Sequence, residues 1–212
     1  MAIKPILFNT EMVRAIMDGR KTCTRRLVKP QPDEKHTYPL GFVTDSTEKK
    51  EVGCFGFGIN EYGGSIQYAK PPYGYAPGDI LYVRETWHKG LERYIYRADY
   101  SDTDKFYRNG KEIEMKWKPS IHMPKEAARI WLKVTDVRVE RLQEISGEGA
   151  LVEGTDKYIH VDGTLNEDQT ITSFIGIWNS TIKKSDLERY GWDASPWVWV
   201  IEFERCEKLE DA

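Results

Sequence analysis

The sequence predicts an α+β fold, a mixed and partly closed β-barrel with short flanking helices and a long insertion. Three observations support this prediction. Residues 80–87 and 128–134 alternate apolar and polar side chains, as strands do. The apolar phase slips by one residue at Thr135-Asp136, which indicates a bulge of the kind found in small barrels. Helical spacing of apolar residues occurs only in short runs.

The amino-terminal segment is predicted to form a strand, a helix and a second strand. Residues 5–8 are a short apolar run, and Asn9-Thr10 supplies favoured helix N-caps. Residues 12–17 carry apolar side chains at helical spacing, and Gly19 suits the left-handed position that ends a helix. Residues 20–27 include β-branched side chains, which favour an extended chain.

A long insertion is predicted at about residues 29–76. It is bracketed by prolines and lacks sustained periodicity, although hairpins fit residues 53–59 and 65–68. Two interpretations stay open: an ordered insertion over the mouth of an active site, or a structureless loop. We assign no separate domain to it, so residues 1–212 are expected to form a single domain.

The second half of the chain is predicted to add short elements. A strand is expected at residues 94–98, a short helix at 148–153 and a polar loop at about 155–172. Ser173 is expected to cap a helix with an apolar side formed by Phe174, Ile175, Trp178 and Ile182. Residues 195–203 are apolar on both faces, so this strand should lie centrally.

The composition excludes several classes of protein. The chain of 212 residues has 31 Lys and Arg against 34 Asp and Glu, and its net charge of −3 argues against a uniformly basic nucleic-acid binder. No apolar run approaches the roughly 18 residues of a membrane span. The amino terminus mixes charged and apolar residues too finely for a signal peptide. We therefore expect a cytoplasmic protein without a membrane partner.

Cysteines and histidines indicate neither a disulfide framework nor a metal site. Cys23, Cys54 and Cys206 are few and far apart. The four histidines are scattered, and no CxxC, HxxxH or HxE spacing occurs. No metal and no cofactor are predicted, and the sequence leaves the oligomeric state open.

The most unusual local feature is a basic cluster between residues 14 and 29. Six Lys and Arg residues stand against one acid, Asp18. Such a run is ordinarily a solvated face. Here it spans the end of a helix and the start of a strand, and arginine suits phosphate or carboxylate recognition. An anion-binding site and a solvated face are equal alternatives.

Within this cluster, Gly19-Arg20-Lys21-Thr22-Cys23-Thr24-Arg25 resembles the G-x-K-x-x-x-R signature of the ASCH domain (activating signal cointegrator homology), which has a PUA-like barrel. Further stretches resemble the larger ASCH proteins of phages and bacteria, in the same order along the chain: residues 77–79 with 83–87, 118–124, 150–154 and 196–201. The resemblance implies a PUA-like fold over nearly the whole chain, with residues 29–76 and 155–172 less covered.

The resemblance implies several activities. Some ASCH proteins are thought to bind RNA, one has been described as a ribonuclease, and a small bacterial member hydrolyses N4-acetylcytidine nucleosides. That hydrolase uses a Lys, a Thr three residues later and a distant Glu, which match Lys21, Thr24 and, by its place in an A-x-x-E segment, Glu153. A nucleoside or RNA ligand is therefore expected. The candidate substrate-binding residues are Arg20, Arg25, Arg26, Arg84, Glu85, Ser120 and His122.

Chemistry sets two conditions on the Lys–Thr–Glu set. A threonine hydroxyl needs a base, so the pKa of Lys21 must fall from about 10.4 through burial or the neighbouring arginines. Glu153 would raise that pKa, unless it serves as a proton shuttle at the leaving group. Lys21 and Thr24 would point to opposite faces of a regular strand. We therefore predict that Lys21 lies in the turn after Gly19, before regular pairing starts.

The other candidates have structural alternatives. Arg84-Glu85 lies on an apolar strand, where a buried ion pair is as expected as a catalytic role. Ser120 and His122 lie between prolines, and His122 can bond either a ligand or the backbone. Trp87 and Tyr82 can stack on a base or belong to the core.

Three classes of function compete. The preferred hypothesis is a hydrolase of modified nucleosides that uses a Lys-activated Thr and a Glu proton shuttle. The alternatives are a non-catalytic RNA- or nucleotide-binding module or ribonuclease, and a phage accessory protein that acts by protein contacts. An enclosed pocket joining Lys21, Thr24 and Glu153 would favour the hydrolase, and an open basic groove would favour the binding module.

Overall fold

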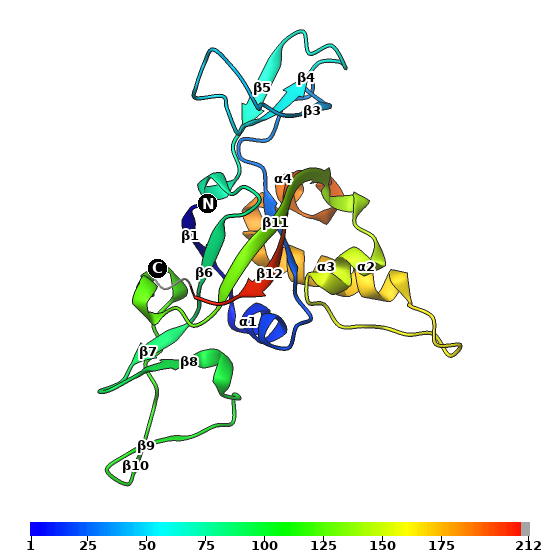
Figure 1. The fold of residues 1–212 in the computed structure, drawn as a ribbon. Coiled ribbons are helices and arrows are strands. Elements are labelled where there is room, and N and C mark those ends of the chain that lie inside the picture. Colours follow the sequence, from blue (N-terminus) through cyan, green and yellow to red (C-terminus); the bar gives the residue numbers. More distant parts are fainter. Residues whose placement is uncertain (209–212) are drawn as a thin grey trace.

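The computed structural model describes residues 1–208 and is built around one five-stranded sheet (Figure 1). Across the sheet the strands are β1 (Ile3–Leu7), β6 (Ile80–Arg84), β11 (Trp131–Arg141), β12 (Trp197–Cys206) and β2 (Cys23–Leu27). β1 and β6 are parallel, and every other neighbouring pair in this sheet is antiparallel. With short helices around this mixed sheet, the predicted α+β class is confirmed.

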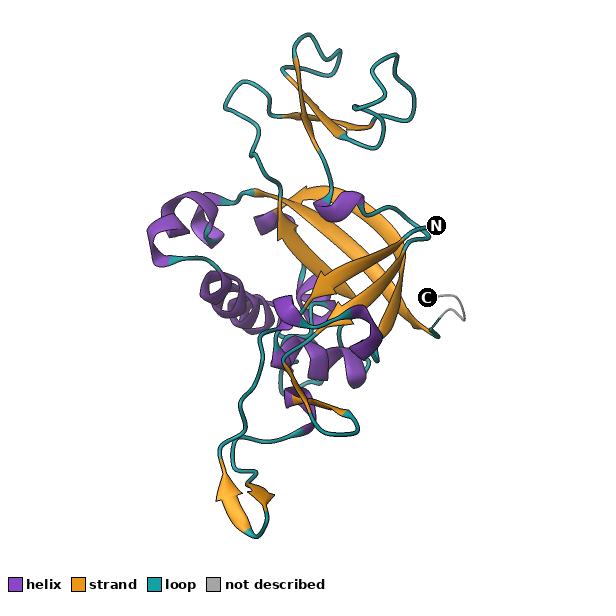
Figure 2. Cartoon of the chain, turned by 90° about the vertical axis from the view of Figure 1, so that its left-hand side faces the viewer, coloured by secondary structure: helices purple, strands orange, loops and turns teal. Residues whose placement is uncertain are grey.

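The sheet is curved but open (Figure 2). Within residues 1–208 no backbone pairing joins the two edge strands, β1 and β2. Arg26 on β2 instead donates through Nη2 to the carbonyl oxygen of Leu7 on β1, over 2.7 Å. A closed barrel would need a ladder of backbone hydrogen bonds between β1 and β2. The described residues have a side-chain contact between these two strands instead, so no closed barrel is found.

The two long strands follow the sequence prediction. The register of β11 against β12 shifts between Val134 and Asp136, so the predicted bulge is confirmed. β12 lies between β11 and β2, with Trp199 in one buried cluster and Val198 and Val200 in another. Because successive strand residues point to opposite faces, β12 is apolar on both sides, as expected for a central strand.

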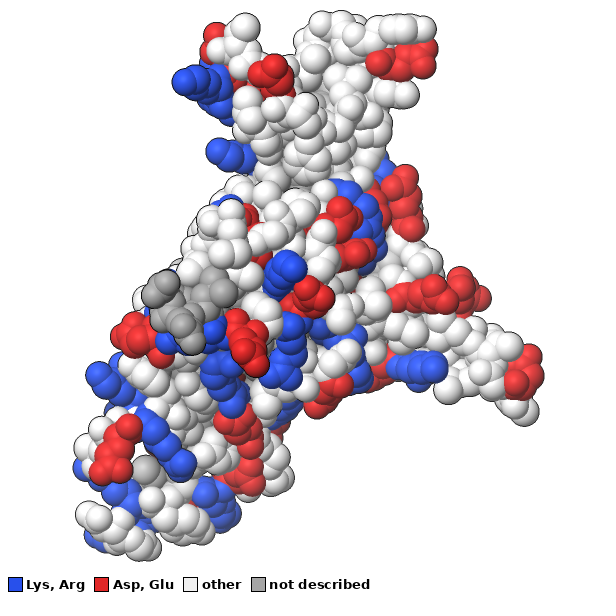
Figure 3. All heavy atoms as spheres, in the orientation of Figure 1, with Lys and Arg blue, Asp and Glu red and all other residues white. Residues whose placement is uncertain are grey.

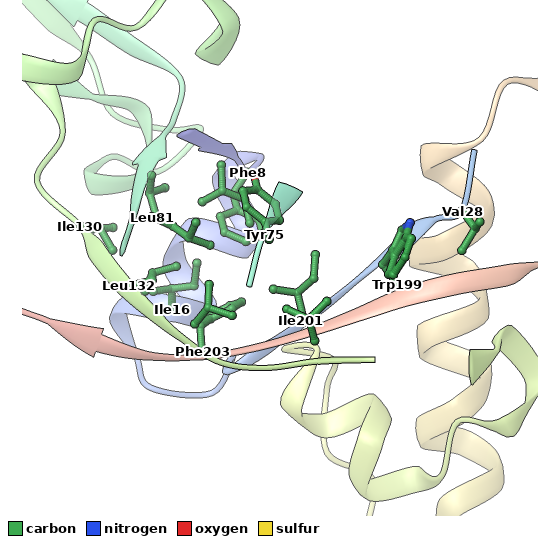
Figure 4. Close-up of a cluster of buried hydrophobic side chains, with 14 of the residues drawn as sticks. Phe8, Ile16, Val28, Tyr75, Leu81, Ile130, Leu132, Trp199, Ile201 and Phe203 are labelled. Carbon is green, nitrogen blue, oxygen red and sulfur yellow. The ribbon is translucent and has the colours of Figure 1, made fainter. Parts of the chain in front are cut away.

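Two helices lie close to the start of β2. α1 (Thr10–Met17) begins at Asn9, whose side chain accepts a hydrogen bond from the Met12 N–H at 2.9 Å. Gly19 follows α1 at φ +74°, as predicted. In Figure 4, Ile16 of α1 packs with Phe203 of the sheet in the larger buried cluster. The other helix, α2 (Gly147–Val152), packs with α3 (Glu167–Thr181) against the opposite face of the sheet.

The helix α3 is longer than the sequence predicts. It begins at Asn166, whose side chain accepts a backbone N–H of the first turn at 3.0 Å. Ser173 therefore lies inside the helix, and the polar loop predicted for 155–172 ends at residue 166. The first turn is acidic, which suits the positive end of a helix but carries no apolar periodicity. Beyond α3, the short helix α4 covers Leu187–Tyr190.

The insertion is ordered, so its interpretation as a structureless loop is wrong. Phe55 packs on Trp199 and Phe57 packs on Trp197, with ring centroids 6.2 and 5.3 Å apart. The insertion lies above the central sheet in Figure 1. Its three strands form an antiparallel sheet in the order β3 (Tyr38–Phe42), β4 (Phe55–Gly58) and β5 (Ile66–Ala69).

Residues 85–130 form a second excursion, at the bottom of Figure 1. The strand predicted at 80–87 ends at Arg84, and the chain then pairs outside the central sheet. The strands of two hairpins are β7 (Trp87–Lys89) with β8 (Tyr94–Tyr96), and β9 (Phe106–Arg108) with β10 (Lys111–Ile113). The short 3-10 helices are η1 Pro72–Gly74, η2 Arg97–Asp99, η3 Ser120–His122, η4 Lys125–Ala127, η5 Leu142–Glu144, η6 Lys184–Asp186 and η7 Trp192–Ala194.

Nowhere in residues 1–208 does a helix have the length and apolar character needed to span a membrane.

Candidate functional site

Lys21 lies in the turn between α1 and β2, as predicted. Its backbone N–H bonds to the Ala15 carbonyl of α1 at 3.0 Å, and β2 starts only at Cys23. Lys21 instead forms an isolated antiparallel bridge with Glu153, the residue directly after α2. Two turns that are far apart in sequence are thereby placed side by side.

The Lys21 ammonium is completely buried and has three acceptors. Nζ lies 2.6 Å from Glu153 Oε2, 2.9 Å from the Glu153 carbonyl and 2.6 Å from the Cys23 carbonyl. Three acceptors match the three donors of a charged lysine. Burial lowers the pKa of Lys21 below its ordinary 10.5, although the Glu153 carboxylate acts in the opposite direction.

Glu153 is held between two cations. Its Oε1 receives Arg25 Nη1 at 3.4 Å while its Oε2 faces Lys21, and its side chain is almost fully buried. Gly154 follows with φ +88°, and a Cβ at this position would lie 2.8 Å from Ala15 Cβ. A glycine is therefore needed for the chain to pass this close to α1.

A cavity of about 700 Å³ opens beside this ion pair, against the free edge of β2. Thr24, Arg25 and Glu153 form part of its polar lining, and α3 contributes an apolar wall that includes Phe174 and Trp178. This volume lies within the usual range for small-molecule sites. Of residues 29–76, Lys29 at the very start of the insertion lines this cavity, whereas none of β3, β4 or β5 does, so the insertion's sheet does not cover this site.

Thr24 and Lys21 reach the cavity differently. Thr24 is buried and lines the cavity. Lys21 is absent from the lining and contacts the cavity wall through Glu153. The structure therefore brings Thr24 and Glu153 together at one cavity and places Lys21 behind Glu153, with no direct Lys21–Thr24 hydrogen bond.

The predicted arginines divide into two groups. Arg25 and Arg26 line the cavity. Arg26 stacks over the Phe8 ring at 5.5 Å, and burial lowers the pKa of its guanidinium. Arg20 is exposed, donates to the Gly154 carbonyl and pairs with Asp18. The basic cluster thus splits between the cavity and the surface.

The remaining predicted binding residues lie outside the cavity. Glu85 is 1% exposed and pairs with Arg129 at 2.9 Å rather than with Arg84. Burial raises the pKa of Glu85, against the opposing effect of Arg129. Arg84 donates to the Ile121 carbonyl. Ser120 and His122, on either side of Ile121 in η3, belong to this same region.

The aromatic residues at the cavity differ from those expected. Trp87 is buried with Met123 in a separate cluster, and Tyr82 packs on Trp131, so both belong to the protein's packing. Trp178 and Tyr190 line the cavity instead. The helical spacing of Trp178 marked it only as a core residue. Tyr190 lies on α4, a short helix that no periodic pattern in the sequence indicates.

Metal binding and disulfides find no support in the described chain. Among residues 1–208 no group of three His, Cys, Asp or Glu side chains is arranged to hold a metal ion. Cys23, Cys54 and Cys206 are free thiols. Burial is the main cause that raises the pKa of Cys23 to about 12, so this thiol is not activated despite its position beside the site.

Comparisons of the chain with known proteins give no assignment. No family model, curated protein or solved structure matches it. The chemistry of the cavity rests on the geometry of Lys21, Thr24 and Glu153.

Proposed function

We propose that this chain is an ASCH-type protein with an opened PUA-like barrel, and that its cavity hydrolyses the amide of a modified nucleoside of the N4-acylated cytidine type. One observation carries the proposal. Thr24 and Glu153 line the same cavity, and Glu153 is hydrogen-bonded to the buried Lys21.

In the proposed first step, Lys21 is the neutral amine and Glu153 carries protons between it and the cavity. The Thr24 proton passes through Glu153 to Lys21 as Oγ forms a bond to the amide carbon. The proton then returns by the same route to the leaving nitrogen, and the C–N bond breaks. A water molecule hydrolyses the resulting ester and restores the Thr24 hydroxyl.

The rest of the cavity suits a nucleoside. Trp178 and Tyr190 offer ring faces or edges to a base, and stacking of this kind is worth about 1–3 kcal/mol per base. Arg25 places a cation near the position where the tetrahedral intermediate would gain negative charge. Arg26 adds a second cation on the same strand.

A long nucleic-acid track is less well supported. On the face seen in Figure 3, acidic and basic residues are interspersed, and the upper part of that face is largely uncharged. Salt-dependent binding to a polyanion needs a run of basic contacts. The enclosed arrangement at Glu153 therefore favours the hydrolase over the RNA-binding module.

The test is release of free cytidine from N4-acetylcytidine and related N4-acyl cytidines. Thr24→Ala and Lys21→Ala should each reduce the rate at least about 100-fold, the scale of losing a positioned acid–base or nucleophilic group. Thr22→Ala is the matched control, because Thr22 is exposed and lies two residues away. Salt-sensitive binding of short RNAs without turnover would overturn the proposal in favour of the binding module.

A further inference from the structure

A line of alternating charges leads from the candidate site across the sheet. Lys21 contacts Glu153, Glu153 contacts Arg25, and Arg25 Nη2 lies 3.2 Å from Glu140 Oε2. Glu140 Oε1 in turn receives Arg138 Nε at 2.6 Å. The outer end of this line is anchored on β11, two strands away from β2.

The sheet register explains why these side chains meet. Arg25 is opposite Val200, and Val200 is opposite Arg138. Directly opposed residues in antiparallel strands point to the same face. Val200 belongs to the buried cluster beneath α2 and α3, so Arg25 and Arg138 flank an apolar residue on that face. Glu140, two residues beyond Arg138, is on the same face and bridges both arginines.

We propose that Glu140 is a positioning residue of the candidate site, which holds Arg25 so that its guanidinium meets Glu153 Oε1 and leaves Oε2 to Lys21. The proposal rests on the function proposed above for its catalytic meaning, but the positioning itself does not. Glu140 lines no part of the cavity and lies 13 residues before Glu153 in the sequence.

Charge balance gives the physical reason. The Arg25 side chain is only 3% exposed, and two carboxylates, Glu140 and Glu153, offset its charge. A buried cation that loses one carboxylate depends more strongly on the other. Without Glu140, Arg25 would interact more strongly with the Glu153 carboxylate and would compete with Lys21 for it. The Lys21–Glu153 contact would then weaken.

The readout is the titration of Lys21 itself, followed by NMR of its labelled side-chain nitrogen. The charged and titratable groups around Lys21 and its neighbour Cys23 are Glu153, Arg25, Arg26, Cys23 and Glu202. Glu140→Gln keeps the shape of the side chain and removes its charge. The midpoint of the Lys21 titration should fall by about 0.5 pH or more.

Two further variants make the result decisive. Glu202→Gln removes another carboxylate that contacts Arg138 but has no contact with Arg25. The Lys21 midpoint in Glu202→Gln reports the direct electrostatic effect of removing a nearby carboxylate. It should shift clearly less than the midpoint in Glu140→Gln. If Glu140→Gln does not fold, Arg138→Gln leaves Glu140 to Arg25 alone, relieves the demand of Arg25 on Glu153 and should shift the Lys21 midpoint in the opposite direction, upward. Equal shifts in the Glu140 and Glu202 variants, or none in either, would overturn the positioning role.

Measuring catalytic activity gives a second test, independent of the Lys21 titration. On an N4-acyl cytidine, at a pH above the Lys21 midpoint, Glu140→Gln should lower kcat about tenfold, because a weaker Lys21–Glu153 contact slows proton transfer, while KM changes little. A Lys21 shift without turnover in the unmodified protein would refute the hydrolase and leave the positioning role intact. Turnover with no Lys21 shift in any variant would refute the positioning role of Glu140 and leave the hydrolase proposal intact.

Discussion

Lys21 Nζ lies 2.6 Å from Glu153 Oε2, and the backbones of these same two residues form an isolated antiparallel bridge. Both the main chain and the side chains therefore fix their separation. The bridge depends on a tight approach to α1, which Gly154 makes possible. Stability and site geometry are consequently coupled at this point.

Gly154→Ala should destabilise the protein by about 2 kcal/mol, because it combines an unfavourable φ with a 2.8 Å clash against Ala15. Gly163→Ala is the matched control: it has nearly the same φ, +86°, but open space around the added methyl. It should cost about 1 kcal/mol. Urea unfolding measures both, and equal losses would contradict the close approach at Gly154.

Asn166→Ala should cost about 1 kcal/mol, because it removes the side-chain acceptor at the start of α3. Ser173→Ala should have almost no cost, since Ser173 lies inside the helix, where alanine is favoured. Thermal or urea unfolding of the two variants gives the comparison. A larger loss at Ser173 would place the helix start where the sequence pattern first indicated it.

Asp79 should make stability depend on acid pH. Burial alone would raise its pKa, but hydrogen bonds from Lys4, the Ala2 N–H and the Ala76 N–H lower it below 3.8. A lowered pKa in the folded state contributes stability above pH 3.8 that is lost as pH falls through the folded value. Asp79→Asn should therefore cost about 2 kcal/mol at pH 7 and much less near pH 2. A loss that is independent of pH would contradict this account.

The proposed reaction should speed up as pH rises. Lys21 must be neutral to act as a base, and its pKa lies below 10.5 because it is buried. We expect kcat/KM on an N4-acyl cytidine to increase with pH until Lys21 is deprotonated. An activity that falls over the same range would mean that the lysine acts in its charged form.

Local sequence patterns predicted the elements around the site well. Asn9 and Gly19 mark the ends of α1 by simple capping chemistry, and the odd spacing of Lys21 and Thr24 correctly placed Lys21 before β2. The phase slip at 135–136 gave the bulge. Each of these depends on neighbours within a few residues, which the sequence displays directly.

Contacts between distant residues could not be predicted in this way. Glu85 pairs with Arg129, and Arg25 with Glu140, because separate segments meet in the folded chain. Trp178 looked like a core residue, and it is buried but also lines the cavity. Helical periodicity reports which side of a helix is apolar, without showing whether a neighbouring strand leaves space beside it.

The central claim is that Thr24 attacks an amide with proton transfer through Glu153 and Lys21. Its most direct measurement is mass spectrometry of the protein after rapid acid quenching during reaction with N4-acetylcytidine. The account predicts an acetyl group on the peptide that contains Thr24 in the unmodified protein and in Thr22→Ala, and none in Thr24→Ala. Release of cytidine at an unchanged rate by Thr24→Ala, with no acetylated peptide in any sample, would contradict it.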